Sequence, residues 1–325
     1  MTKRYAIVSI GTNSTRLLLA DIGPEHPRTE LARSTGTRIG EGLGERGRLD
    51  DEPMERTLEA IAQYARAIRG HYVRLFAVAT SALRRAQNGE AFAQRVSDLL
   101  RVPVRVLSGE EEAAASYRGA ITAFDGKRGE RIGVLDTGGG STEYAVGDGP
   151  APEQMVSCEI GAVRLTEAVP ALSGRDGAAA GDAVAAAREK AKEALQPVLT
   201  CAPVEHVAFV GGSATATAAI MQGRRAPFES FALTRADLQR TLDRLLPMTL
   251  AERKEVPGMK PQRADILPAG IIVLDTALEL LGRDRAVATT ADLLLGILLQ
   301  ERDAAGGRPT HERQPNTRAY REPRR

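Results

Sequence analysis

The sequence predicts an α/β protein of two domains, and three observations support this prediction. The chain has 325 residues, which is enough for two domains of ordinary size. Short apolar segments typical of buried strands alternate with amphipathic segments typical of helices. A unit made of a strand, a glycine turn and a second strand occurs twice, about 125 residues apart, which indicates a structural repeat.

The first copy of this unit lies at the start of the chain. Residues 5–10 form an apolar segment that stops at Gly11, and a second strand is expected over 15–22. Strands and helices then alternate: we expect a helix over 51–69, a strand over 73–79, a helix over 90–100, a strand over 104–107 and a helix from its N-cap Ser108 to about residue 123.

The second copy follows a polar, glycine-rich segment over 125–129, where we place the domain boundary. A buried strand over 132–136 leads into the second glycine turn, and a strand over 143–146 leaves it. The other expected elements are helices over 161–169, 178–199, 234–246 and 262–281, strands over 206–210 and 286–288, and a helix over 291–302.

This pattern divides the chain into a first domain over 1–124 and a second domain over 125–302. The C-terminal helix over 291–302 is expected to pack back on the first domain. From Asp303 the apolar pattern ends, and Gly, Pro and Arg become frequent. Residues 303–325 are therefore predicted to be a disordered basic tail, which is either simply solvated or attracts polyanions.

The composition argues against several classes of function. A net charge of +2 does not favour a nucleic-acid-binding protein, and with 4% aromatic residues and no Trp the chain is poorly equipped to stack on bases. The two cysteines, Cys158 and Cys201, indicate neither a disulfide framework nor a metal motif. No apolar segment reaches the length of a membrane span, so we expect a cytoplasmic protein with no membrane and no nucleic-acid partner.

The glycine turns have the composition of a phosphate-binding site. The first contains Gly11, Thr12, Asn13 and Ser14, and the second contains Gly138, Gly139, Gly140, Ser141 and Thr142. Glycine lets backbone N–H groups approach a phosphate closely, and hydroxyls add hydrogen bonds without charge. One such turn alone is more often a structural hairpin, but two, each directly after a buried strand, favour a phosphate clamp. A third turn, at Gly211 and Gly212, precedes a helix whose N-terminus can attract an anion.

Charged residues accompany these turns. Asp136 and Glu143 flank the second turn, where they could hold Mg²⁺ through oxygen ligands. The run Glu110-Glu111-Glu112 opens a helix, and at most one or two of its carboxylates can face a site; the alternative is that they stabilise the helix N-terminus. Arg84 and Arg85 follow a buried strand and could bind phosphate, or could form a solvated pair on the surface.

Six segments, in the same order along the chain, resemble the exopolyphosphatase/guanosine pentaphosphate phosphohydrolase family. They read SIGTNS from Ser9, ATSALRRAQN from Ala79, SGEEEA from Ser108, DTGGGSTE from Asp136, GAVRLTE from Gly161 and RADILPAG from Arg263. The resemblance covers about residues 5–300 and is to the short, two-domain form of the family. It implies an α/β fold of two actin- and sugar-kinase-like (ribonuclease H-like) domains, with the active site in the interdomain cleft.

The resemblance also implies roles for individual residues. Glu112 matches the family's catalytic base, and Arg84 matches its phosphate-binding arginine. Asp136 and Glu143 match residues that handle a metal ion, for which we expect Mg²⁺, with Mn²⁺ as a substitute. The substrate-binding residues are then those of the three turns: Gly11, Thr12, Asn13, Ser14, Gly138, Gly139, Gly140, Ser141, Thr142, Gly211 and Gly212.

The function implied by the resemblance is Mg²⁺-dependent release of terminal orthophosphate from inorganic polyphosphate. The same chemistry on the 5′-phosphate of guanosine pentaphosphate is the first alternative. Ser9 stands where the family usually has Asp, so the second alternative is a protein that binds polyphosphate or guanosine penta- or tetraphosphate with impaired catalysis. Because the C-terminal helices are rich in Ala and Leu, we expect a homodimer.

Overall fold

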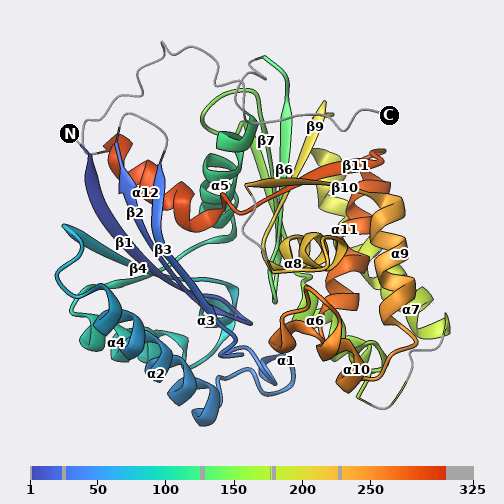
Figure 1. The fold of residues 1–325 in the computed structure, drawn as a ribbon, viewed down its shortest axis with the longest axis horizontal. Helices are drawn as coiled ribbons and strands as arrows, with labels where there is room; N and C mark the ends of the chain where they lie inside the picture. The colour runs from blue at the N-terminus through green and yellow to red at the C-terminus, as the bar shows by residue number, and fades with distance from the viewer. Residues whose placement is uncertain are drawn as a thin grey trace.

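The computed structural model describes residues 2–23, 27–124, 129–175, 177, 181–225 and 229–304. These residues form two mixed β-sheets with helices packed on them, which confirms the predicted α/β class (Figure 1). Most of the expected boundary segment over 125–129 lies outside the described residues, as does the tail from residue 305 onward. Within the described part of the chain, no helix combines the length and the apolar character needed to cross a membrane.

The first sheet has five strands in the order β3-β2-β1-β4-β5. These are β1 (Lys3–Ile10), β2 (Thr15–Ile22), β3 (Arg28–Thr35), β4 (Arg74–Ala79) and β5 (Val104–Val106). Strands β1, β2 and β3 pair antiparallel, whereas β1, β4 and β5 run parallel. The apolar stripes of helices α2 (Asp51–Ile68) and α4 (Gly89–Leu100) cover one face of this sheet, and the short helices α1 (Leu43–Arg46) and α3 (Ser81–Arg85) lie in its connections.

The second sheet has six strands in the order β10-β11-β9-β6-β7-β8. These are β6 (Ile132–Thr137), β7 (Thr142–Gly147), β8 (Gln154–Cys158), β9 (His206–Val210), β10 (Ser230–Thr234) and β11 (Arg285–Thr289). The larger apolar core lies between this sheet and its helices, which are α6 (Ala162–Ala168), α7 (Gly181–Ala194), α8 (Gly212–Met221), α9 (Arg235–Leu245), α10 (Leu250–Glu255) and α11 (Leu267–Leu280).

The two sheets repeat one plan. In each sheet an antiparallel group of three strands is joined, through its first strand, to parallel strands on the other side. Both leading hairpins close with the same hydrogen bond: Gly11 N–H donates to the Ser14 carbonyl at 3.0 Å, and Gly138 N–H donates to the Ser141 carbonyl at 3.0 Å. The structural repeat predicted from the glycine turns is therefore confirmed.

The structure differs from the predicted elements in several places. Strands β3, β8 and β10 were not predicted, and each lies at an edge of its sheet. The helix predicted over 262–281 is a 3₁₀ turn, η4 (Pro261–Arg263), followed by α11 from Leu267. The break has a physical cause, because Pro268 lacks a backbone N–H and is tolerated only in the first turn of a helix.

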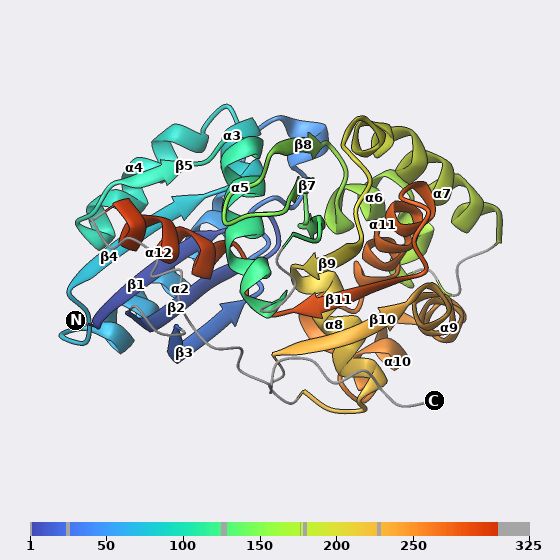
Figure 2. The same ribbon diagram turned by 90° about the horizontal axis from the view of Figure 1, so that it is seen from above.

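Helices α5 (Gly109–Ala120) and α12 (Leu293–Ala304) lie side by side between the two sheets (Figure 2). Helix α12 packs its apolar face on β1 and β2, and α5 packs against β6, β7 and β9. Their backbones meet at two glycines. A Cβ atom on Gly296 would stand 1.7 Å from the Ala115 carbonyl oxygen, and one on Gly119 would stand 2.2 Å from the Asp292 carbonyl oxygen. This crossing joins the C-terminal helix, the first sheet and the second sheet into one structure.

We predict that Gly296→Ala destabilises the protein by about 1–3 kcal/mol or more, because the methyl group overlaps backbone that cannot rotate away. Urea unfolding followed by circular dichroism measures the change. Gly149→Ala is the matched control, since a Cβ at Gly149 meets no atom within 4 Å. Equal midpoints for the two variants would show that the helix crossing is looser than the structure indicates.

Candidate active site

The two glycine turns abut each other at the junction of the sheets. A Cβ atom on Gly139 would stand 3.0 Å from Cβ of Thr12. One on Gly140 would stand 2.9 Å from Oγ1 of Thr12 and 2.8 Å from Oγ of Ser81. A side chain at either glycine would push the turns apart, so glycine at these positions is what lets them meet.

The backbone at the tips of the turns carries free donors. Among the described residues, the N–H groups of Thr12, Asn13, Gly139 and Gly140 have no hydrogen-bond acceptor. The carbonyls of the same turns are occupied: Arg38 N–H donates to Asn13, Gly40 N–H to Thr12, and Val163 N–H to Gly139, at 2.9–3.0 Å. The turns are thus anchored through their acceptors, and their donors stay available to an anion.

Side chains of the turns differ in what they can offer. Oδ1 of Asn13 and Oγ of Ser81 are buried and have no partner in the described structure. The Asn13 amide donates to Oγ of Ser14 at 3.2 Å. The Thr142 hydroxyl, which was predicted to bind substrate, donates to the Ile160 carbonyl at 2.7 Å and is fully buried. The Thr142 side chain therefore stabilises the loop at Ile160. Ser81 is a candidate substrate-binding residue that the sequence prediction omitted.

Three carboxylates lie beside the turns: Glu112 and Glu143 are buried, and Asp136 is half-buried. Asp136 and Glu143 are directly opposite each other on β6 and β7, and Glu112 enters from α5. Burial raises the pKa of Glu112 to about 7, although its hydrogen bond and ion pair with Arg84 oppose the shift. Burial raises the pKa of Asp136 to about 6 against a hydrogen bond from Ser116. Burial, followed by the charges of Glu112 and Asp136, raises the pKa of Glu143 well above its ordinary value.

The three glutamates at the start of α5 have different environments. Ser108 and Glu111 form a capping box, in which Glu111 N–H donates to Oγ of Ser108 at 3.1 Å and Ser108 N–H donates to the Glu111 carboxylate at 2.8 Å. Glu110 and Glu111 are exposed, and Glu112 alone of the three is buried. Glu111 therefore caps the helix, and Glu112 is the buried carboxylate of the run.

Arg84 joins α3 to α5 at this point. Its Nη1 donates to the Leu107 carbonyl at 2.7 Å and also pairs with the Glu112 carboxylate. Arg85 instead lies near Glu159, with its Nε 3.8 Å from the Glu159 carboxylate. The two neighbouring arginines therefore do not act as one fork, and Arg84 is the one placed next to the buried acid.

Two further arginines reach the site from distant parts of the sequence. Nη2 of Arg263, on η4, lies 3.5 Å from Oγ of Ser14. Its guanidinium occupies the space over Gly212, where a Cβ would stand 1.9 Å from Cζ. Arg16 on β2 lies opposite Ser9 on β1 and forms an ion pair with Asp292. Neither arginine was among the predicted site residues, although Arg263 opens a segment that carried the family resemblance.

The third turn lies beside the second. Gly211 has a φ of 90°, and a Cβ there would stand 2.7 Å from the Thr137 carbonyl oxygen and 2.9 Å from the Asp136 carboxylate. Gly211 and Gly212 are thus brought next to Asp136 and Arg263, at the N-terminus of α8. All three glycine turns and the acids Glu112, Asp136 and Glu143 belong to one region.

The acids at this region fit a hard divalent cation. Asp136 and Glu143 supply carboxylate oxygens. The negative charges of Glu112 and Asp136 help to raise the pKa of buried Glu143, and such a cation would offset this repulsion. In the part of the chain that the structure describes, no three His, Cys, Asp or Glu side chains converge closely enough to form a metal site by themselves. Mg²⁺ or Mn²⁺ held here would therefore take its remaining ligands from water and substrate oxygens.

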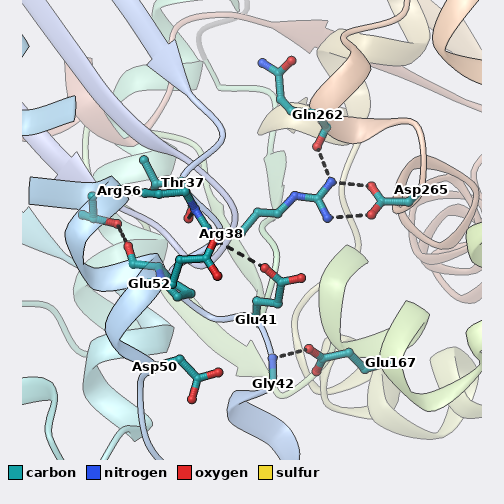
Figure 3. A network of polar contacts seen from close by, with 12 residues as sticks. Thr37, Arg38, Glu41, Gly42, Asp50, Glu52, Arg56, Glu167, Gln262 and Asp265 are labelled. Carbon is teal, nitrogen blue, oxygen red and sulfur yellow. Dashed lines mark hydrogen bonds and ion pairs between the residues drawn. The ribbon is translucent and has the colours of Figure 1, made fainter. Parts of the chain in front are cut away.

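A polar clasp links the two halves of the molecule next to the first turn (Figure 3). The Arg38 guanidinium donates to both carboxylate oxygens of Asp265, at 2.7 and 2.8 Å, and Gly42 N–H donates to the Glu167 carboxylate at 3.2 Å. Burial would raise the pKa of Asp265, but the hydrogen bond and charge of Arg38 hold it below its ordinary value. Since Arg38 N–H also binds the Asn13 carbonyl, one residue ties the first turn to the opposite domain.

The fold and the site together define an α/β protein of two matching sheets, whose hairpin turns meet beside three carboxylates, two of them buried. The sequence model of the Ppx/GppA phosphatase family matches residues 18–301, and the chain belongs to that family. The family predicted from the six sequence segments is confirmed.

Individual relatives agree with this membership. Exopolyphosphatase 2 of Mycobacterium tuberculosis is 35% identical over 323 residues, which span 91% of this chain and 98% of that protein. A guanosine-5′-triphosphate,3′-diphosphate pyrophosphatase of Vibrio vulnificus is 30% identical over 287 residues, which span 86% of this chain but 55% of the Vibrio protein.

Solved structures of the family share the fold. The Aquifex aeolicus Ppx/GppA family member has a TM-score of 0.76 at 29% identity, and the match covers 95% of this chain and 100% of that chain. An exopolyphosphatase-like protein has a TM-score of 0.84 at 28% identity, and the match covers 92% of this chain and 98% of that chain. The predicted α/β fold of this family, with its two mixed sheets, is thus confirmed.

We predict that Arg38→Met weakens the clasp, because Asp265 keeps only its 3.2 Å contact with Arg175. The expected cost is about 3 kcal/mol in urea unfolding, at the lower end for a broken buried pair. Small-angle scattering should also show a larger radius of gyration. Arg46→Met is the control, since exposed Arg46 pairs with Asp50 inside the first domain. Indistinguishable stability and scattering of the two variants would refute the clasp.

Proposed function

We propose that this chain hydrolyses the terminal phosphoanhydride bond of inorganic polyphosphate and releases orthophosphate. The observation that carries the proposal is the pairing of two features. Four free backbone N–H donors lie at the tips of abutting turns, and a buried carboxylate, Glu112, lies close by with its pKa raised to about 7. Oriented donors bind phosphate oxygens, and a carboxylate that titrates near neutrality is a suitable general base.

In the proposed mechanism, the terminal phosphoryl group lies between the two turns. The free N–H groups, the Ser14 and Ser141 hydroxyls and Arg84 bind its oxygens and stabilise the charge that spreads over them in the transition state. Mg²⁺ near Asp136 and Glu143 would neutralise part of the substrate charge. Asp136 and Glu143 are proposed as its protein ligands.

Glu112 accepts a proton from a water molecule as the water oxygen bonds to phosphorus. The bond from that phosphorus to the bridging oxygen breaks, and the shortened chain departs with the bridging oxygen. Arg84 orients the Glu112 carboxylate between turnovers, because its Nη1 is held in turn by the Leu107 carbonyl. Glu112 then loses the proton to solvent.

A second candidate is removal of the 5′-phosphate of guanosine pentaphosphate. The similarity to the Vibrio pyrophosphatase favours it, and the chemistry at the turns would be the same. Exopolyphosphatase is preferred because the Mycobacterium relative is more similar and matches this chain over almost its whole length. Direct competition between long polyphosphate and guanosine pentaphosphate separates the two substrates.

We predict that Glu112→Gln lowers the rate of phosphate release from polyphosphate by about 10²–10⁴-fold, the usual contribution of a general base. A colorimetric phosphate assay measures the rate in the presence of Mg²⁺. Glu110→Gln, on the same helix and exposed, should keep the wild-type rate. Release that continues unchanged in Glu112→Gln would eliminate Glu112 as the base.

A third possibility, suggested by Ser9, is that the chain binds polyphosphate without hydrolysing it, and assays of the wild-type protein test it. If it binds polyphosphate tightly but releases no phosphate with any divalent metal, the chain is a binding protein rather than a hydrolase. That result would refute the proposed activity and leave the proposed binding by the turns intact.

We predict that kcat falls as the pH drops below about 7, because the base acts only when deprotonated and burial raises the pKa of Glu112 to about 7. The rate should decrease about tenfold per pH unit on the acid side. Glu112→Asp provides the control, since a new carboxylate position changes the pKa of the base but leaves the substrate unchanged. An acid limb that stays in place in Glu112→Asp would belong to the substrate and contradict the assignment.

A further inference from the structure

A group of cations extends from the first glycine turn along the second domain. Lys260 directly precedes η4, and its carbonyl accepts a hydrogen bond from Arg263 N–H at 2.8 Å. The Lys260 ammonium is half-buried and lies within electrostatic reach of Arg263, Arg16 and Arg225. Arg16 is neutralised by Asp292, but in the described part of the chain Lys260, Arg263 and Arg225 have no acidic partner.

Holding these positive charges close together is energetically unfavourable unless an anion binds to them. Burial, and then the neighbouring arginines, lower the pKa of Lys260 to about 8. Burial, and then Arg16, lower the pKa of Arg263 to about 10. Proteins seldom retain half-buried like charges unless an opposite charge offsets them, and the described side chains do not supply one here.

The cations are also ordered in space relative to the turns. Arg263 is the nearest, because its Nη2 lies 3.5 Å from Oγ of Ser14 and its guanidinium covers Gly212. Lys260 precedes Arg263 by three residues, at the start of η4. Arg225 comes after the C-terminal end of α8, the helix that begins at Gly212. A linear anion with its end between the turns would therefore meet Arg263 first and Lys260 next.

We propose that Lys260 binds the leaving part of the substrate, at the second or third phosphate from the cleaved end, and so selects linear chains of three or more phosphates. This inference rests on the proposed function, because it takes the two turns as the site of the terminal phosphate. Lys260 is here a specificity-determining residue and takes no part in bond cleavage. Its ammonium is a compact charge on a flexible stem, which suits a chain whose phosphates lack a fixed orientation.

Binding measurements on the full-length protein test this inference. In a Glu112→Gln background, which should suppress turnover, isothermal titration with inorganic tripolyphosphate is expected to give a Kd about tenfold higher for Lys260→Met than for Lys260. Affinity for orthophosphate should change less than about twofold, since orthophosphate fills only the space between the turns. Lys254→Met, at an exposed lysine on α10, is the matched control and should change neither value.

The charge of Lys260 gives a second readout. Arg16, Arg225 and Arg263 face it. The pKa of Arg16 is raised and that of Arg263 is about 10, so both lie above the pKa of Lys260. Between pH 7 and 9, tripolyphosphate affinity should therefore fall relative to that of Lys260→Arg, which stays protonated and should otherwise bind like the wild type. Comparing the two proteins with the same ligand cancels the ionisation of the ligand itself.

Each outcome bears on one claim. Unchanged tripolyphosphate affinity in Lys260→Met, or an equal loss for orthophosphate and tripolyphosphate, overturns the role of Lys260. If wild-type protein releases no phosphate from any polyphosphate while its tripolyphosphate affinity still depends on Lys260, the proposed function fails and the binding site stands. If circular dichroism shows that Lys260→Met is unfolded, Lys260→Gln replaces it, and the same two ligands decide.

Discussion

The contact of Thr12 with Gly139 and Gly140 is the constraint on which the site depends. Two strands of different sheets end at this contact, and each presents N–H groups that its own sheet cannot use. The α5–α12 crossing sets the spacing of the sheets behind it, because Gly296 lets the helix backbones touch. Arg38 and Asp265 secure the same contact from the other side. Binding geometry is thus determined by backbone packing, and the side chains add to it.

Burial at this contact explains the electrostatics of the acids. Glu112, Asp136 and Glu143 are removed from water by the same packing that brings the turns together, so the pKa of each is raised. Arg84 offsets part of the cost at Glu112, and the Ser116 hydroxyl offsets part at Asp136. A polyanionic substrate accompanied by a divalent cation would change this balance most strongly for Glu143, which feels both other carboxylates. The acids are therefore poised to respond to what binds between the turns.

Sequence reasoning predicted what is encoded locally. Central strands are apolar runs next to glycine turns, and Asp136 and Glu143 lie within two residues of the second turn. Glu112 lies in SGEEEA, one of the segments that carried the family resemblance. The strands it missed are edges: β3 is almost wholly exposed and reads RTELARST, which lacks the apolar alternation of a half-buried strand. Arg263 was missed as a site residue for a different reason. It is 249 residues from Ser14, and only the folded chain shows that the two side chains meet.

Ser9 lies opposite a paired arginine in the first sheet. It is buried on β1, and its cross-strand partner on β2 is Arg16, whose guanidinium pairs with Asp292 and lies within electrostatic reach of Asp136. A carboxylate at position 9 would add a fourth acid to a region where Glu112 and Asp136 already raise the pKa of Glu143, and it would compete with Asp292 for Arg16. Asp292 also caps the start of α12 by accepting from Leu294 N–H at 3.1 Å. With a neutral serine at position 9, Arg16 pairs with Asp292 alone, so the attachment of α12 to the first sheet is preserved. One negative charge is thereby absent from the side of the site on which Asp136 lies.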